Sequence, residues 1–130
     1  MSFKATLEID GGKTYRVVNC DYSLAQFVDD TGRPSSTVRA GTINLTVEST
    51  DDTELFEWMC DSYMRKNGKI TFNKRDLDAK MKVLEFNEAY MVAYKEIFDN
   101  SGPGSMQESF SLSAHVLKMG NGEIESEWVM

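Results

Sequence analysis

The chain has few of the residues on which metal sites, disulfide frameworks and most nucleophilic active sites depend. Its 130 residues include two cysteines, one histidine and two prolines. Cys20 and Cys60 lack the close spacing of metal and redox motifs, so we expect two reduced core thiols. A single histidine cannot complete a usual zinc set, and no cofactor motif is present. The low proline content and a hydrophobic fraction of 41% exclude a largely disordered chain.

Long apolar runs and clustered basic charge are also missing. The sequence has no stretch of 18 apolar residues, which a membrane helix would require. Residues 1–10 also lack the apolar segment of a signal peptide. We therefore expect a protein that starts in the cytoplasm and does not insert into a membrane. The net charge of −7 argues against nucleic acid as a partner, because phosphate-binding surfaces need clustered lysine and arginine.

The sequence instead contains the two-residue alternation of β-strands, with one helical exception. Strand-like alternation covers residues 2–10, 37–48, 81–98 and 109–116. Residues 51–66 have apolar spacings of three and four, with acidic residues first and basic residues last, as in an amphipathic helix. The predicted apolar face of this helix consists of Leu55, Phe56, Met59, Cys60, Tyr63 and Met64, and Asn67-Gly68 is predicted to end it. We predict one mainly β domain over residues 1–130, an antiparallel β-barrel of two packed sheets with one flanking α-helix.

Three further segments have features that a small enzyme would not require. A second strand is expected from about Thr14 to Phe27, and a long polar loop that follows it is predicted to project; this loop consists of Asp29, Asp30, Thr31, Gly32, Arg33, Pro34, Ser35 and Ser36. Residues 89–94 are apolar on both strand faces, so either the helix or another subunit must cover the face made by Ala89, Met91 and Ala93. The last long strand has one polar face, the row Ser109, Ser111, Ser113 and His115.

Catalytic constellations are weak in this sequence. Ser113 and His115 with a remote acid could form a triad, but mid-strand alternation does not provide the sharp turn of a nucleophile elbow. Cys60 falls on the predicted apolar face of the helix, which favours a core thiol over a nucleophile. The sequence therefore predicts no enzyme, and no catalytic, metal or cofactor site. The projecting loop and the excess apolar strand surface fit a protomer of a ring or tube better.

The order of these segments resembles the Hcp (TssD) family, the inner-tube protein of type VI secretion, in its Bacteroidota-type variant. The resemblance depends on FKATLEIDGGKTYRVVNCDYSLAQFVDDTGRPSSTVRAGTINLTVES, on MKVLEFNEAYMVAYKEIFDNSG and on SFSLSAHVLKMG, and it extends over essentially the whole chain. It implies hexameric rings that stack into a tube inside a contractile sheath. It also implies that the tube carries effector proteins, is capped by the VgrG spike and is secreted without a signal peptide.

The resemblance also suggests roles for the three segments. The loop Asp29–Ser36 would be an arm that contacts a neighbouring subunit or ring, and Ala89, Met91 and Ala93 would lie at a subunit interface. The row from Ser109 to His115 is the candidate lumen face, with the sheath-facing side as the alternative.

Two other interpretations are consistent with the sequence. The chain could be a monomeric small β-barrel that binds a ligand in a cavity lined by residues 89–94, or a phage-type tail tube subunit.

Overall fold

The structure is a computed structural model that describes residues 3–74, 80–100 and 106–125. In chain order its elements are β1 (Phe3–Ile9), β2 (Thr14–Tyr22), β3 (Thr42–Glu48), α1 (Glu54–Cys60), β4 (Arg65–Lys74), β5 (Lys80–Phe98), β6 (Met106–Met119) and β7 (Gly122–Glu125). Within these residues no helix has the length and apolar character needed to cross a bilayer.

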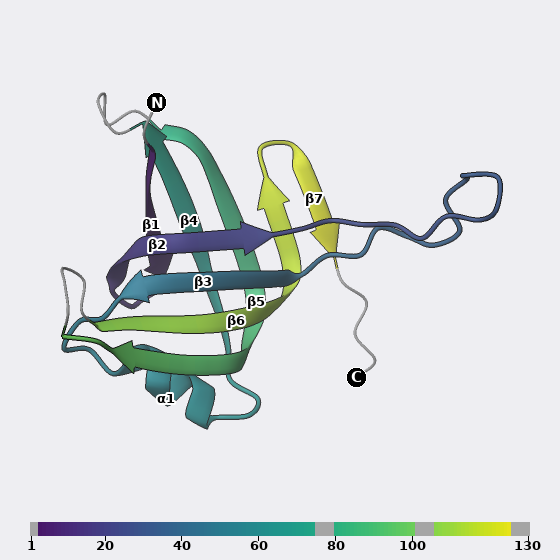
Figure 1. Cartoon of the computed structure of the whole chain (residues 1–130). Coiled ribbons are helices and arrows are strands. Elements are labelled where there is room, and N and C mark those ends of the chain that lie inside the picture. Colours follow the sequence, from purple (N-terminus) through teal and green to yellow (C-terminus); the bar gives the residue numbers. More distant parts are fainter. Residues whose placement is uncertain (1–2, 75–79, 101–105, 126–130) are drawn as a thin grey trace.

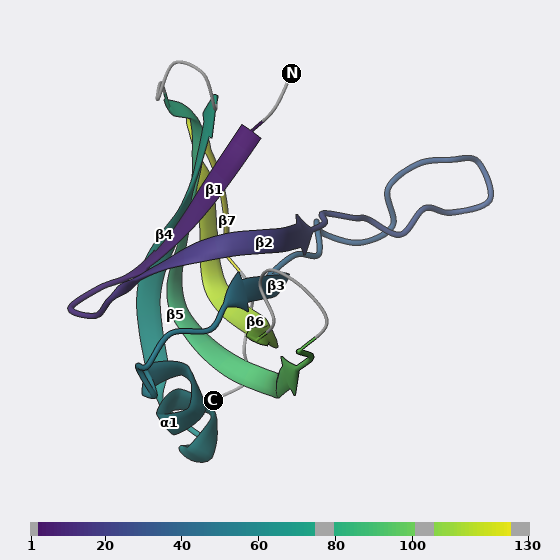
Figure 2. The same cartoon turned by 60° about the vertical axis from the view of Figure 1, so that its left-hand side comes forward.

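The seven strands form one antiparallel sheet that closes on itself. Its order is β3-β2-β1-β4-β5-β6-β7, and an additional ladder joins β3 to β6. The first six strands therefore make a closed barrel, and β7 is an extra strand beside β6. β2 and β3 run across the direction of β1 and β4, so the barrel has two layers, and α1 flanks it near β5 (Figures 1 and 2). The predicted fold class, a mainly β antiparallel barrel with a single helix, is confirmed.

The inward-facing residues fill the barrel with side chains. Leu7, Ile70, Phe86 and Leu112 come from four strands and are fully buried, which follows from the alternation of inward and outward residues along each strand. The helix adds Trp58, whose indole Nε1–H donates to the Met64 carbonyl at 2.9 Å. The interior is thus a packed core.

The helix is shorter than the predicted range 51–66. It begins at Glu54, whose N–H donates to Asp52 Oδ1 at 2.6 Å, and it ends at Cys60. The residues from Arg65 onward pair with β5, because a strand ladder with a buried face is more stable than another helical turn in solvent. Gly68 therefore lies inside β4 and does not end a helix.

The predicted apolar face of the helix also needs correction. Leu55 and Trp58 are its buried residues, whereas Phe56 and Cys60 are exposed. Two turns of helix present only a narrow stripe to the barrel, and that stripe runs through Leu55 and Trp58. Cys60 is therefore a surface thiol.

Candidate assembly surfaces

Four strands form a continuous polar surface on the outside of the barrel. β2 pairs with β3, β3 with β6, and β6 with β5, so these strands lie side by side. The inward residues of β6, such as Phe110 and Leu112, belong to the core, and the serine row occupies the outward positions between them. The predicted polar face of this strand is therefore present as a surface.

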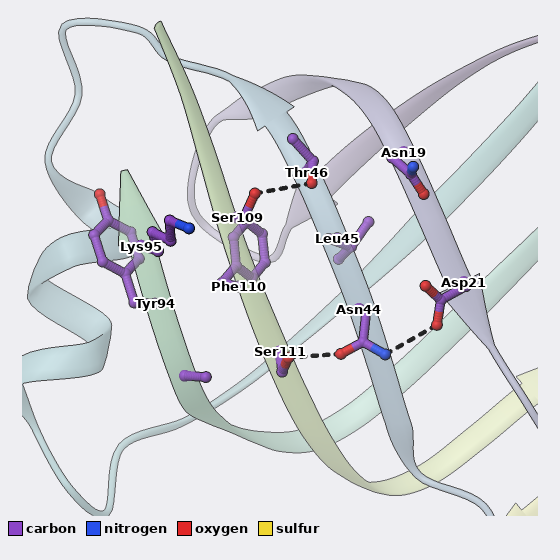
Figure 3. Close-up of a pocket in the computed structure, with 11 residues that line it drawn as sticks. Asn19, Asp21, Asn44, Leu45, Thr46, Tyr94, Lys95, Ser109, Phe110 and Ser111 are labelled. Carbon is purple, nitrogen blue, oxygen red and sulfur yellow. Dashed lines mark hydrogen bonds between the residues drawn. The ribbon is translucent and has the colours of Figure 1, made fainter. Parts of the chain in front are cut away.

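Hydrogen bonds connect the serine row to the neighbouring strands (Figure 3). Ser111 Oγ donates to Asn44 Oδ1 at 2.6 Å, and Asn44 Nδ2 donates to Asp21 Oδ1 at 2.9 Å. The hydroxyl oxygens of Thr46 and Ser109 are 2.9 Å apart. Since each bond joins different strands, the polar groups hold β2, β3 and β6 in register and leave a surface that is largely uncharged.

A shallow groove of about 320 Å³ crosses this surface. It is lined by Asn19, Asp21, Asn44, Leu45, Thr46, Ala93, Tyr94, Lys95, Ser109, Phe110 and Ser111. Further along β6, Ser113 is half-buried, and His115 Nε2 lies 2.9 Å from Glu125 Oε1. This contact attaches β7 to β6. The four predicted positions Ser109, Ser111, Ser113 and His115 thus share one face, and their assignment to a lumen remains a prediction.

The polar surface ends at two strand segments that pair on one side only. Among the described residues, Asn19–Tyr22 of β2 pairs only with β3, because β1 turns away after Val17. Likewise, Met91–Phe98 of β5 pairs only with β6, because β4 begins opposite Tyr90. Unpaired strand edges offer backbone donors and acceptors to another chain. The sequence pattern could not reveal these edges, because they depend on where the partner strands end.

Exposed apolar side chains accompany the free edge of β5. Val92 is 54% exposed and Phe98 is 67% exposed, and Ile97 lies between them with 44% exposure. Phe56 of the helix is also exposed and meets the Tyr94 ring edge-on, with the centroids 5.9 Å apart. The apolar surface that the sequence predicts for this strand is therefore present at Val92, within the predicted residues 89–94, and continues beyond them to Ile97 and Phe98.

Of the three predicted interface residues, two are buried inside the barrel. Ala89 and Met91 belong to the core, and only Ala93 is exposed. The reason is a pair of irregularities in β5, a positive φ of 51° at Glu88 and a register shift between Met91 and Ala93. Each β-bulge changes which residues point inward. Ala89 and Met91 therefore cannot contact another subunit directly.

The segment between β2 and β3, residues 23–41, projects away from the barrel in both views, and we call it the arm (Figures 1 and 2). It contains the whole predicted loop Asp29–Ser36 and exceeds it at both ends. The bridges Ala25–Arg39 and Val28–Pro34 connect its two sides. The exposed side chains of Phe27 and Val28 lie on this arm.

The arm has an ordered tip built around one carboxylate. Asp29 Oδ1 accepts hydrogen bonds from the Thr31 hydroxyl at 2.7 Å, the Thr31 N–H at 2.9 Å and the Arg33 N–H at 3.1 Å. The Thr31 hydroxyl and then the two amides lower the pKa of Asp29. The guanidinium of Arg39 lies 4.6 Å from the centre of the Phe27 ring. The arm thus has its own local contacts although it extends into solvent.

A second groove, almost entirely apolar and about 360 Å³ in volume, lies where the arm leaves the barrel. It is lined by Tyr22, Leu24, Val38, Leu84, Leu117, Lys118, Met119, Gly122, Glu123 and Ile124. Leu24 and Val38 are exposed large apolar side chains, so the arm and its base present apolar surface that this chain alone leaves in water.

Several solved structures are similar to this chain in overall fold. Hcp1 from Flavobacterium johnsoniae matches with a TM-score of 0.88 and 47% identity, covering 95% of this chain and 99% of that one. Hcp1 from Salmonella typhimurium matches with a TM-score of 0.75 and 14% identity, over 95% and 92% of the two chains. A chain of the anti-feeding prophage baseplate matches with a TM-score of 0.55 and 11% identity, over 90% and 91%. The latter two show a shared fold.

A comparison with curated protein sequences gives no significant match. The match to Hcp1 at 47% identity over nearly the whole of both chains places this barrel in the class of Hcp-type tube proteins. Residues 1–129 match the family described as "Hemolysin coregulated protein Hcp (TssD)", and the chain belongs to this family. The resemblance to the Hcp (TssD) family is confirmed, and the similarity to Hcp1 from Flavobacterium johnsoniae confirms the Bacteroidota-type variant.

Proposed function

We propose that six copies of this chain form a closed ring and that the rings stack into the inner tube of a type VI secretion system. Membership of the Hcp family and the match to Hcp1 support a tube subunit. The observation that carries the ring is the pair of free edges at opposite sides of the four-stranded polar surface. In the ring, Met91–Phe98 of one copy pairs with Asn19–Tyr22 of the next.

This pairing joins two different surfaces, so every copy uses both of its free edges. Such an assembly closes into a ring when a whole number of equal rotations, one per copy, makes a full turn. Six-fold closure is supported by the anti-feeding prophage baseplate, a six-fold symmetrised structure that contains a chain of similar fold. Pairing also covers part of the apolar edge that includes Val92 and Phe98, which are exposed in the isolated chain. The polar face of the four strands then lines the lumen. Its hydroxyl and amide groups are uncharged, so they do not bind passing effector proteins by strong electrostatic attraction.

A matched pair of substitutions tests the ring. Val92→Lys places a charge beside the free edge of β5, whereas Met81→Lys places one on an exposed position of the part of β5 that pairs with β4. In native mass spectrometry the parent chain and Met81→Lys should have a mass close to six times 14.7 kDa. Val92→Lys should remain folded and run as smaller species. A parent chain that is monomeric at high concentration would overturn the proposal.

The arm makes the contact between stacked rings or neighbouring subunits. Its apolar side chains Phe27 and Val28 are exposed, and both its sides project beyond the barrel. Deletion of Asp30–Ser35 should leave folded rings, because the deleted residues contribute nothing to the core, but it should abolish stacking and secretion. Negative-stain electron microscopy of deleted and parent protein measures this. Tubes of unchanged length would remove the arm from the stacking contact.

In the cell, this tube would lie inside the contractile sheath, carry effector proteins and end at the VgrG spike. The chain would then be cytoplasmic before firing and secreted afterwards without a signal peptide. This part is tested by measuring the protein in the culture medium of cells with and without an intact sheath, because secretion should require the sheath.

The ligand-binding alternative predicts a cavity lined by residues 89–94. In the structure, Ala89 and Met91 are instead packed in a filled core.

A further inference from the structure

The core contains one carboxylate, on the strand that closes the barrel. Glu108 of β6 is 3% exposed, and it is the only charged side chain that the described part of the chain buries this deeply. It occupies the same face of β6 as Phe110 and Leu112, so strand alternation directs it into the interior. Burial of a carboxylate is costly unless a cation or several donors compensate.

The neighbours of Glu108 are one hydroxyl donor and several acids. Tyr94 Oη, on β5, donates to Glu108 Oε2 at 2.8 Å. Glu96 stands directly opposite Glu108 in the β5–β6 register, and its own carboxylate accepts from Ser49 Oγ at 2.8 Å. Other titratable groups near this region are Tyr15 on β2, Glu54 of α1, which acts on Tyr15, and Asp52, before α1. Asp52 is itself paired with Lys13 of β2's hairpin, with Nζ and Oδ2 2.9 Å apart. Within residues 3–74, 80–100 and 106–125, no lysine, arginine or histidine forms an ion pair with Glu108.

These surroundings favour the neutral carboxyl group. Burial raises the pKa of Glu108 above its ordinary value, and the negative charges of Glu96 and Asp52 raise it further, while the hydrogen bond from Tyr94 opposes the change. An ionised Glu108 therefore faces Glu96 across the ladder without a compensating cation. Like charges directly opposite each other in a sheet weaken the pairing of the two strands.

We propose that Glu108 is an acid-sensitive attachment between β6 and the free end of β5. When the carboxyl group takes up a proton, the repulsion across the Glu96–Glu108 pair ends and β5 is held more firmly at Tyr94–Phe98. When it loses the proton, this end of β5 is loosened. Because the same segment is the proposed ring contact, which rests on the function proposed above, acidification also strengthens the ring.

The sign of the stability effect follows from linkage. A carboxyl group with a raised pKa in the folded state contributes stability that is fully present below its unfolded pKa and is lost as the pH rises through the folded pKa. The parent chain should therefore lose stability, relative to a variant that cannot ionise, as the pH rises from about 4 through the raised pKa of Glu108. The comparison runs from acidic to mildly alkaline solution. Glu108→Gln is that variant, and Glu85→Gln, an exposed position on β5, is the control.

Urea unfolding of the three proteins across this pH range tests the attachment. The folding equilibrium constant of Glu108→Gln should exceed that of the parent severalfold at the alkaline end and approach it at the acidic end, while Glu85→Gln follows the parent. Tyr94→Phe provides a second test, because loss of the hydroxyl donor should make the pH dependence steeper than in the parent. Parallel stability curves for the parent and Glu108→Gln would overturn the proposal.

Native mass spectrometry at both ends of the pH range distinguishes a failure of this proposal from a failure of the proposed ring. A ring that persists to lower protein concentration in acid, with the response lost in Glu108→Gln, supports the coupling. A ring response that Glu108→Gln retains would overturn the coupling. Protein that is monomeric throughout contradicts the proposed function, whereas the urea experiment still decides whether Glu108 acts within the chain.

Discussion

Replacing Gly68 with alanine is a test in which conformational propensity and packing predict opposite changes in the free energy of unfolding. Glycine inside a strand lacks side-chain packing and has excess freedom when unfolded, so Gly→Ala should stabilise by about 0.5–1 kcal/mol. In the structure, however, a Cβ at Gly68 would lie 2.6 Å from the Glu8 carbonyl oxygen and 2.7 Å from Phe86 Cζ. Glu8 belongs to the paired strand β1 and the Phe86 ring is fully buried, so neither yields easily.

Overpacking of this kind costs about 1–3 kcal/mol, so Gly68→Ala should destabilise the chain by a net amount of about 1–2 kcal/mol. With a urea m-value of about 1–3 kcal/mol/M, the unfolding midpoint should fall by roughly 1 M. Gly122→Ala is the control, since its Cβ would meet the Met119 carbonyl oxygen at an ordinary 3.4 Å. Both should be measured by circular dichroism at one protein concentration, because assembly adds stability. A Gly68→Ala midpoint at or above the parent's would refute the packing argument.

Two further substitutions test the helix and the arm. Trp58→Phe removes the donor to the Met64 carbonyl and part of a buried ring, so it should lower the free energy of unfolding by about 2 kcal/mol, measured in urea; an unchanged value would mean that the indole is not anchored as described. Asp29→Ala removes the acceptor for Thr31 and Arg33, so their amide hydrogen exchange should accelerate while the barrel amides keep their protection. Because the pKa of Asp29 is lowered, the parent should lose this protection only in acid, as the pH falls through that pKa.

The strands were predictable from the sequence because most have one buried face. β5, for example, was expected over residues 81–98 and is found over Lys80–Phe98. The predicted helix was too long because the helical spacing of apolar residues continues to Met64. Nothing local reveals that Arg65 and the residues after it pair with β5.

The candidate surfaces were predictable only in part, for two physical reasons. The bulges at Glu88 and at Met91/Ala93 contain no glycine or proline, so simple alternation placed Ala89, Met91 and Ala93 on one face. The free edges depend on where partner strands end, which is a property of the folded register. The burial of Glu108, by contrast, could have been predicted from the sequence, because strand alternation places it on the same face as Phe110 and Leu112.

The ladder between β3 and β6 has a consequence for how the protein is made. A ribosome releases β3 long before Gln107–Ser113, the residues with which it pairs. Until then the apolar side of β3, with Ile43, Leu45 and Val47, has no cover from β6 and is available to chaperones or to aggregation. Contacts between distant parts of a chain also slow folding. Synthesis in large amounts should therefore demand protection of the nascent chain until its final third has emerged.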